Sequence, residues 1–170
     1  MSEILVQQIL NIFSGITNVS FGKEILVFLI SCMPILELRG GILAASILSM
    51  NPISSFIICF IGNILPVPFI LLFITPIFNR LKNTKLFSNL VHKIEDRALN
   101  KKDKIEKYEF WGLMIFVGIP LPGTGVWTGA LIASLLNINK KKAFIAILMG
   151  SIIAGSIMMI LSFGLLKTIL

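Results

Sequence analysis

The chain has 170 residues, of which 56% are hydrophobic and only 14% are charged. A soluble domain carries about 25% charged residues, so this composition predicts an all-α integral membrane protein that forms a single membrane domain, 1–170. The net charge of +7 does not indicate nucleic-acid binding. Nine of the 15 basic residues lie in 80–107 and three more in 140–142, a distribution typical of cytoplasmic loops beside membrane segments.

The residues needed for common catalytic and metal sites are missing. Cys32 and Cys59 lie in apolar stretches without a CxxC spacing, and we interpret them as small buried hydrophobic residues. His92 is the single histidine and falls in a polar segment. We therefore expect no enzyme activity, no metal site and no cofactor.

The first half begins with an amphipathic pattern at Ile4–Ile16, which is too short to cross about 30 Å of hydrocarbon. We interpret it as a helix lying in the membrane interface, with a short spanning helix as the alternative. The apolar stretch 25–50 follows and is interrupted by 34–41. The stretch 53–78 has no charge and predicts one tilted spanning helix, kinked near Asn63, Pro66 and Pro68.

A basic connector, 81–108, separates this half from the next, and its residues 86–94 predict an amphipathic surface helix. The second half repeats the earlier order. The uncharged stretch 110–139 is interrupted by 120–125, and 143–166 predicts a second spanning helix.

An offset of 88 residues aligns the two halves. Between 26–64 and 114–152, 12 of 39 positions are identical without a gap. Matched pairs include Pro34 with Pro122 and Asn51 with Asn139. We predict two repeats, at about 22–80 and 109–168.

The basic residues favour one topology for these repeats. If each interrupted segment enters and leaves on the same side, then Lys140–Lys142 share a face with the connector, as the positive-inside rule requires. The prediction is therefore two inverted repeats, each a re-entrant helical hairpin plus one transmembrane helix. We place the protein in the cytoplasmic membrane, with the connector 81–108 and Lys140–Lys142 on the cytoplasmic side. A homodimer is expected, because one chain with about two full crossings can hardly cover the polar tips formed by the interruptions at 34–41 and 120–125.

Glu37 and Arg39 are the only charges inside the apolar segments of the chain. Each costs at least about 2.5 kcal/mol in hydrocarbon without a partner. Residues two apart face different directions on an α-helix, so we predict an unwound tip broken by Pro34, Gly40 and Gly41 rather than a simple helical pair. A helix beginning at such a tip points free N–H groups at an anion, and Arg39 would add donors that match phosphate or carboxylate.

The second tip, residues 120–129, carries no charge. Thr124 is the expected N-cap of its helix, and Trp127 would either stack on a ligand or anchor the tip. Asn63 and Ser151 match at the 88-residue offset and would line one cavity. The predicted substrate-binding or coupling residues are Glu37, Arg39, Pro34, Gly40, Gly41, Asn63, Pro120, Pro122, Gly123, Thr124, Gly125, Trp127 and Gly129.

A purely structural role is the alternative for the charged site residues and also for the small residues at 150–155. Glu37, Arg39 and Asn63 could form a cluster that locks the fold without binding a substrate. Gly150, Ser151, Ala154 and Gly155 are better explained as a close helix-packing face, since small residues four apart let helices approach.

The segments 37–41 and 120–130 together resemble the small multidrug export family of prokaryotic membrane proteins. More distantly, the double re-entrant arrangement is similar to DedA-like membrane proteins. The first resemblance implies transport of small molecules. The second implies an acidic and a basic residue inside the membrane and transport of a polyprenyl-phosphate lipid carrier of the undecaprenyl-phosphate type.

The leading hypothesis is thus a secondary transporter in which Glu37 carries a proton or acts as counter-ion. The alternatives are a polyprenyl-phosphate lipid translocase and a membrane scaffold or assembly factor. The expected partners are membrane lipids and a small-molecule or lipid-phosphate substrate.

Overall fold

Apolar runs and local breaks divide the chain into helices. The computed structural model describes residues 4, 6–8, 21–82, 102–121 and 123–164, and within them it contains helices and no strand. The elements are α2 (Gly22–Cys32), α3 (Glu37–Ile47), α4 (Pro52–Ile64), α5 (Pro66–Lys82), α7 (Lys102–Gly118), α8 (Val126–Leu135), α9 (Lys140–Met159) and the π-helical turn η1 (Ile160–Gly164). The all-α prediction is confirmed over this part of the chain.

Two helical segments are long and apolar enough to cross a membrane, namely Pro52–Ile74 with 23 residues and Lys140–Gly164 with 25. At 1.5 Å per residue they extend about 35 and 37 Å, more than the roughly 30 Å of a hydrocarbon core. Their outer faces carry exposed apolar side chains four residues apart, which are Ile57, Ile61, Leu65 and Phe69 on one and Ile145, Met149, Ile153 and Ile157 on the other. Such continuous apolar stripes are suited to contact with lipid.

The first long segment has the break that its prolines predict. Leu65 separates α4 from α5, and its backbone remains in the right-handed helical region. Pro66 has no N–H, so it cannot bond to the carbonyl oxygen of Gly62 four residues earlier. The Cys32 thiol donates to that oxygen instead, over 3.1 Å.

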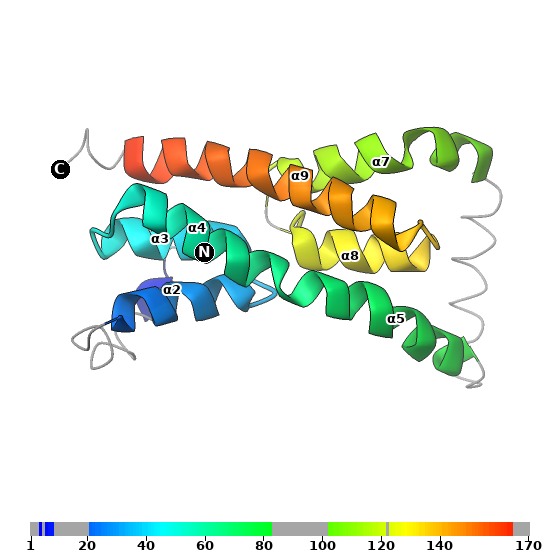
Figure 1. Cartoon of the computed structure of the whole chain (residues 1–170), viewed down its shortest axis with the longest axis horizontal. Coiled ribbons are helices and arrows are strands. Elements are labelled where there is room, and N and C mark those ends of the chain that lie inside the picture. Colours follow the sequence, from blue (N-terminus) through cyan, green and yellow to red (C-terminus); the bar gives the residue numbers. More distant parts are fainter. Residues whose placement is uncertain (1–3, 5, 9–20, 83–101, 122, 165–170) are drawn as a thin grey trace.

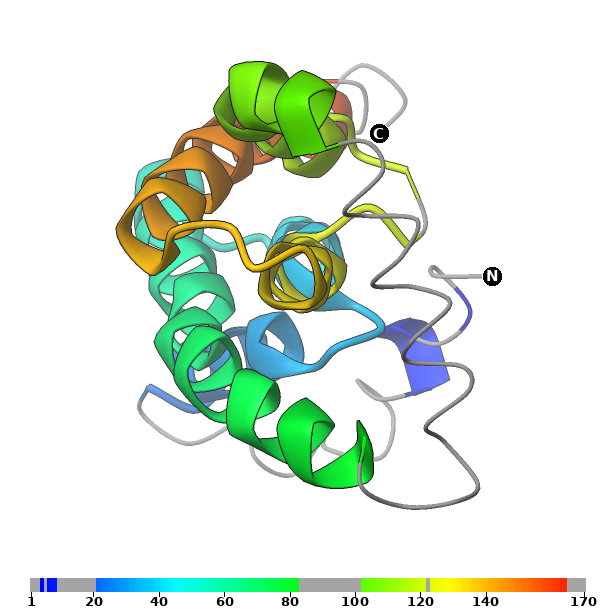
Figure 2. The same ribbon diagram turned by 90° about the vertical axis from the view of Figure 1, so that its right-hand side faces the viewer.

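The remaining helices form two hairpins that occupy opposite ends of the molecule. Figure 1 shows α2 and α3 in one half of the long axis and α7 and α8 in the other, while α9 and the α4–α5 pair run along both halves. Seen along that axis, α3 and α8 lie almost end to end in the centre, with α4, α5, α7 and α9 around them (Figure 2). The turns that end α2 and α7 therefore meet near the middle of the molecule.

Local structure matches at the 88-residue offset. Asn51 caps α4 by accepting from two backbone N–H groups, and Asn139 caps α9 in the same way. Ser49 and Asn137, which follow α3 and α8, have left-handed backbones with φ of 53° and 54°. Corresponding residues thus end and begin corresponding helices.

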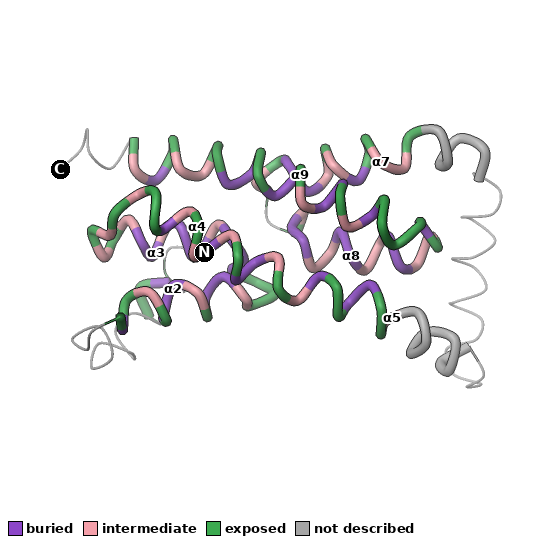
Figure 3. Tube along the Cα trace, in the orientation of Figure 1, coloured by how far each residue is buried: buried purple, intermediate pink, exposed green. Residues whose placement is uncertain are grey.

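Two apolar clusters form the core, one in each half of the long axis. The first surrounds α2, α3 and α4 and includes Val6, Val27 and Ile42. The second joins α5, α7, α8 and α9 around Val117 and Ile147. Figure 3 shows that the buried residues of α9 lie on its inner side along both halves.

The small residues of α9 lie at close contacts. A Cβ added to Gly150 would come within 2.6 Å of the Met114 carbonyl oxygen, and one added to Gly155 within 2.7 Å of the Phe56 ring. Ser151 and Ala154 are buried between them. The prediction of a close helix-packing face is confirmed.

The basic ends of the helices lie together. The end of α5, the start of α7 and the start of α9 with Lys140–Lys142 are at the same end of the molecule (Figure 1). The surface helix expected at 86–94 lies outside the described residues, as does most of the helix expected at Ile4–Ile16. Of the latter, Ile4 and 6–8 are helical, and Val6 is fully buried.

Candidate functional site

The candidate site is the place where the two tips meet. Glu37 is the first residue of α3, and its side chain is only 4% exposed. Its backbone is left-handed, with φ of 51°, which is uncommon for a residue other than glycine. The preceding residues 33–36 form a bend and turns, so the chain is unwound around Pro34 as predicted. The predicted break at Gly40 and Gly41 is wrong, because both lie within α3, where their lack of a side chain allows close packing.

The Glu37 carboxylate caps α8. The Trp127 N–H donates to Glu37 Oε1 over 3.3 Å, and the Val126 N–H also faces the carboxylate. A negative charge is favourable here because the first N–H groups of a helix have no intrahelical partner and carry the positive end of its dipole. The anion at this helix terminus therefore belongs to the chain itself.

The prediction that Thr124 caps α8 is wrong. The N-cap position is Gly125, which has no side chain to offer. The Thr124 hydroxyl remains within its own loop, where it donates to the carbonyl oxygens of Ile119 and Leu121. Glu37 fulfils the capping role that local sequence assigned to Thr124.

Arg39 binds both the acid and the opposite tip. Its Nη2 lies 3.5 Å from Glu37 Oε2, and its Nη1 donates to the carbonyl oxygen of Leu121. Two residues so close in sequence can pair because Glu37 stands at the helix start with a left-handed backbone, outside regular helical geometry. The Arg39 side chain is 18% exposed and is therefore the more accessible member of the pair.

Gly125 provides the space that the carboxylate occupies. A Cβ added to Gly125 would overlap the Glu37 carboxyl group. The Gly125 backbone is extended, with φ of −100°, so glycine is required here for space rather than for backbone conformation. At the 88-residue offset Gly125 corresponds to Glu37 itself, so the acid and its receiving glycine occupy matching positions.

Asn63 performs a second capping role. Its Oδ1 accepts from the Leu38 N–H at the start of α3, and its Nδ2 donates to Ser151 Oγ, both over 3.1 Å. Asn63 and Ser151 are almost fully buried. The two residues that were expected to line a shared cavity are thus in direct contact.

Trp127 anchors the first tip. Its indole Nε1–H donates to the carbonyl oxygen of Cys32, the last residue of α2, over 3.2 Å. This bond corresponds to one of the two roles predicted for Trp127, that of anchoring the tip.

The other predicted residues lie in the two tips or within the helices that follow them. Pro34 and Gly123 are exposed, and Pro120 is half-buried. Gly40, Gly41 and Gly129 are buried, and a Cβ on Gly41 would overlap the Ser31 hydroxyl. Pro122 lies outside the described residues.

Hydrogen bonds satisfy the polar groups of the site. Among the described residues, no buried side-chain nitrogen or oxygen lacks a partner, and no group of three or more His, Cys, Asp or Glu residues could hold a metal ion. Sequence reasoning did not identify the Cys32 and Leu121 carbonyl groups, because backbone acceptors have no residue-type signal. The pairing of Glu37 with Gly125 at the offset was the available clue.

A family model described as "Putative small multi-drug export protein" matches residues 37–157, more than two thirds of the chain, which includes Glu37, Arg39 and the second tip. Neither the curated proteins nor the solved structures contain a match. The family and the two long apolar helices together indicate a membrane protein. By the extent of the match, the chain belongs to the small multi-drug export family.

Proposed function

We propose that this protein is a secondary transporter that exports an organic cation across the membrane. The family description suggests a membrane transporter of drug-like molecules. The observation that carries the proposal is the Glu37 carboxylate, the only charged side chain that is buried among the described residues. It lies at the meeting point of two helix termini, a common construction for ion and substrate sites in transporters.

The proposed architecture is a pair of inverted repeats with re-entrant hairpins. The 11-residue helices α2 and α3 extend about 16 Å each, roughly half the hydrocarbon thickness. A hairpin of this length can reach the middle of the bilayer and return. The opposite placement of the α2–α3 and α7–α8 hairpins supports the inverted arrangement, as do the matched caps Asn51 and Asn139.

Glu37 is suited to exchange one cation for another. Backbone N–H groups of α8 hold the carboxylate in place independently of Arg39. A cationic substrate can therefore replace the guanidinium at Oε2 while the carboxylate stays positioned. A proton on Glu37 removes the charge that attracts the substrate, and alternation between proton and substrate couples export to proton entry.

An anionic substrate fits this geometry less well. The free N–H groups at the start of α8 would otherwise bind a phosphate, but the Glu37 carboxylate occupies them. A phosphate would also meet the negative charge of Glu37. The polyprenyl-phosphate alternative is therefore disfavoured by the same contact that favours a cation.

The proposal is tested by export of tetraphenylphosphonium from proteoliposomes with an imposed pH gradient. Glu37→Gln keeps an oxygen acceptor for the Trp127 N–H but removes the charge, and we expect it to abolish transport. Glu24→Gln, which removes an acid at the start of α2 away from the tips, is the matched control and should transport normally. Wild-type export by Glu37→Gln would refute the coupling role.

A structural role for the same cluster is the second candidate, because Arg39 and Glu37 each bond to the opposite tip. Measuring both the stability and the transport of Glu37→Gln distinguishes the two functions. If Glu37→Gln unfolds at the wild-type SDS concentration but does not transport, the charge serves transport. If it loses stability and transport together, the cluster serves the fold.

We further propose that the basic helix ends face the cytoplasm of a prokaryotic cell, since cytoplasmic loops are enriched in Lys and Arg. Labelling of Lys141→Cys from the periplasmic side alone would contradict this orientation. A homodimer would cover the exposed tip residues Ile35 and Leu121, which are 82% and 55% exposed. A monomer with full transport in nanodiscs would contradict the dimer.

A further inference from the structure

A groove separate from the tips lies between the two long apolar segments. Leu71 and Leu72 of α5 form one wall, and Phe144 and Ile145 of α9 form the other. Its volume is 460 Å³, within the range of about 300–1,000 Å³ that holds small ligands. The groove is open along the side of the molecule rather than enclosed.

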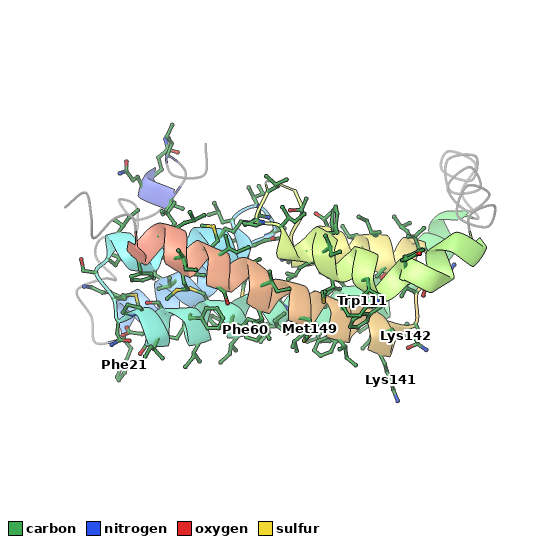
Figure 4. The ribbon with its side chains drawn as sticks, turned by 90° about the horizontal axis from the view of Figure 1, so that it is seen from above. Phe21, Phe60, Trp111, Lys141, Lys142 and Met149 are labelled. Atoms are coloured by element: carbon green, nitrogen blue, oxygen red, sulfur yellow. The ribbon has the colours of Figure 1, made fainter. Side chains whose placement is uncertain are left out.

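Positive charge is concentrated at one end of this groove. Lys140 and Lys141, the first residues of α9, contribute to its lining, and both are exposed. Among the residues that the structure describes, no acidic one belongs to the lining. Figure 4 shows the Lys141 side chain extending away from the ribbon at the end where α9 begins. The lining is almost wholly apolar, so Lys140 and Lys141 contribute their hydrocarbon stems to it, and as exposed residues they can hold their ammonium groups beside the groove.

The position of the groove in the bilayer follows from helix length. The segment Lys140–Gly164 extends about 37 Å, so its first turn reaches beyond a hydrocarbon core of roughly 30 Å. The apolar walls then lie at the depth of acyl chains, and the lysines at the depth of phosphate groups. Exposed Phe69 and Phe73 continue the apolar surface on the α5 side.

We propose that this groove binds one anionic glycerophospholipid. An acyl chain packs between Leu72 and Ile145, and the lipid phosphate pairs with Lys140 and Lys141. Charge complementarity decides the occupant. A cationic drug would be repelled by both lysines, and a neutral zwitterionic lipid would gain less from them. The site does not depend on Glu37 or on the proposed transport.

Native mass spectrometry of the purified full-length protein tests the charge requirement, with dioleoylphosphatidylglycerol and dioleoylphosphatidylcholine as probes. One basic residue near a membrane surface changes anionic-lipid affinity by about fivefold. We expect Lys141→Gln to weaken phosphatidylglycerol binding about fivefold and to leave phosphatidylcholine binding unchanged. Lys142→Gln, the matched control, removes the same charge one residue away and outside the lining, and it should change little. Equal losses for the two variants would overturn the site, since they would indicate diffuse attraction.

A second variant tests the groove without changing the charge. Ile145→Trp fills the space between α5 and α9, and we expect it to reduce phosphatidylglycerol binding roughly tenfold by excluding part of an acyl chain. Ile157→Trp, on the outward face of the same helix and outside the lining, is the control. Wild-type binding by Ile145→Trp would overturn the proposal. Neither measurement uses transport, so failure here leaves the function of Glu37 unaffected.

Discussion

The two tips begin matching helices but carry different residues at the matching position. The first tip begins its helix with an acid, Glu37, and the second places Gly125 at the matching position. The first therefore supplies a carboxylate, and the second supplies the space and the free N–H groups that receive it. Two identical acidic tips would bring like charges together, and two identical glycine tips would leave both helix termini without an anion. The difference makes the tips complementary.

The two helix starts are also satisfied by different means. At α3 the Leu38 N–H donates to the amide of Asn63, a residue of the same half of the chain. At α8 the partner comes from the other half. Ser151, which matches Asn63 at the offset, accepts the Asn63 amide N–H instead of capping α8. The second half therefore depends on the first for its cap.

Gly125→Ala should disturb this complementarity most. The new Cβ would overlap the Glu37 carboxylate, and the displaced acid would lose its bond to the Trp127 N–H. We expect a loss of about 3 kcal/mol in the free energy of unfolding, in the range seen when a buried charge loses its partner. SDS titration in mixed micelles measures it. Gly112→Ala is the control, because a Cβ there meets nothing within 4 Å. Equal stability of the two variants would contradict the steric role of Gly125.

Asn63→Ala should have the next largest effect. It removes the acceptor of the Leu38 N–H and the donor to Ser151 at one buried position, so we expect a loss of about 2 kcal/mol. Ser151→Ala removes only one side-chain bond, and bonds of this kind in membranes average about 0.6 kcal/mol. The same titration compares them. If Ser151→Ala cost as much as Asn63→Ala, the cap on α3 would be unimportant.

Asn51→Ala and Asn139→Ala should have the smallest effects and nearly equal ones. Each asparagine accepts from two N–H groups at the start of a long helix, and the loss of such a cap costs about 1 kcal/mol. The expected outcome is a similar fall in unfolding free energy for both variants. A cost confined to one of them would show that the two halves match in geometry but not in energetics.

Much of the fold could be predicted because its causes are local. A 26-residue stretch without charge indicates a spanning helix, and Pro66 determines where its hydrogen-bond ladder fails. The packing role of Gly150 and Gly155 followed from their spacing, and the structure confirms it. Asn51 and Asn139, which match at the 88-residue offset, cap matching helices in the structure.

The contacts of the site could not be predicted because they join distant residues. Thr124 is a good cap by residue type, but a carboxylate 87 residues earlier in the chain takes its place. The alignment suggested a common location for Asn63 and Ser151, whereas only the packing of α4 against α9 shows that they touch. The bond from Trp127 to the Cys32 carbonyl depends likewise on how the hairpins meet.

The left-handed backbone of Glu37 depends on the contacts of its charged side chain. An L-residue in this region is about 1–2 kcal/mol less stable than in a right-handed helix, so other contacts must hold the tip in this form. Those contacts are the bonds of the Glu37 carboxylate to α8 and to Arg39. In the proposed transport cycle, a proton on Glu37 would weaken the contact with Arg39 and leave an oxygen acceptor for the Trp127 N–H, so the tip would lose only part of what opposes its relaxation. Under that proposal, one proton on Glu37 would change the backbone of the tip as well as its charge.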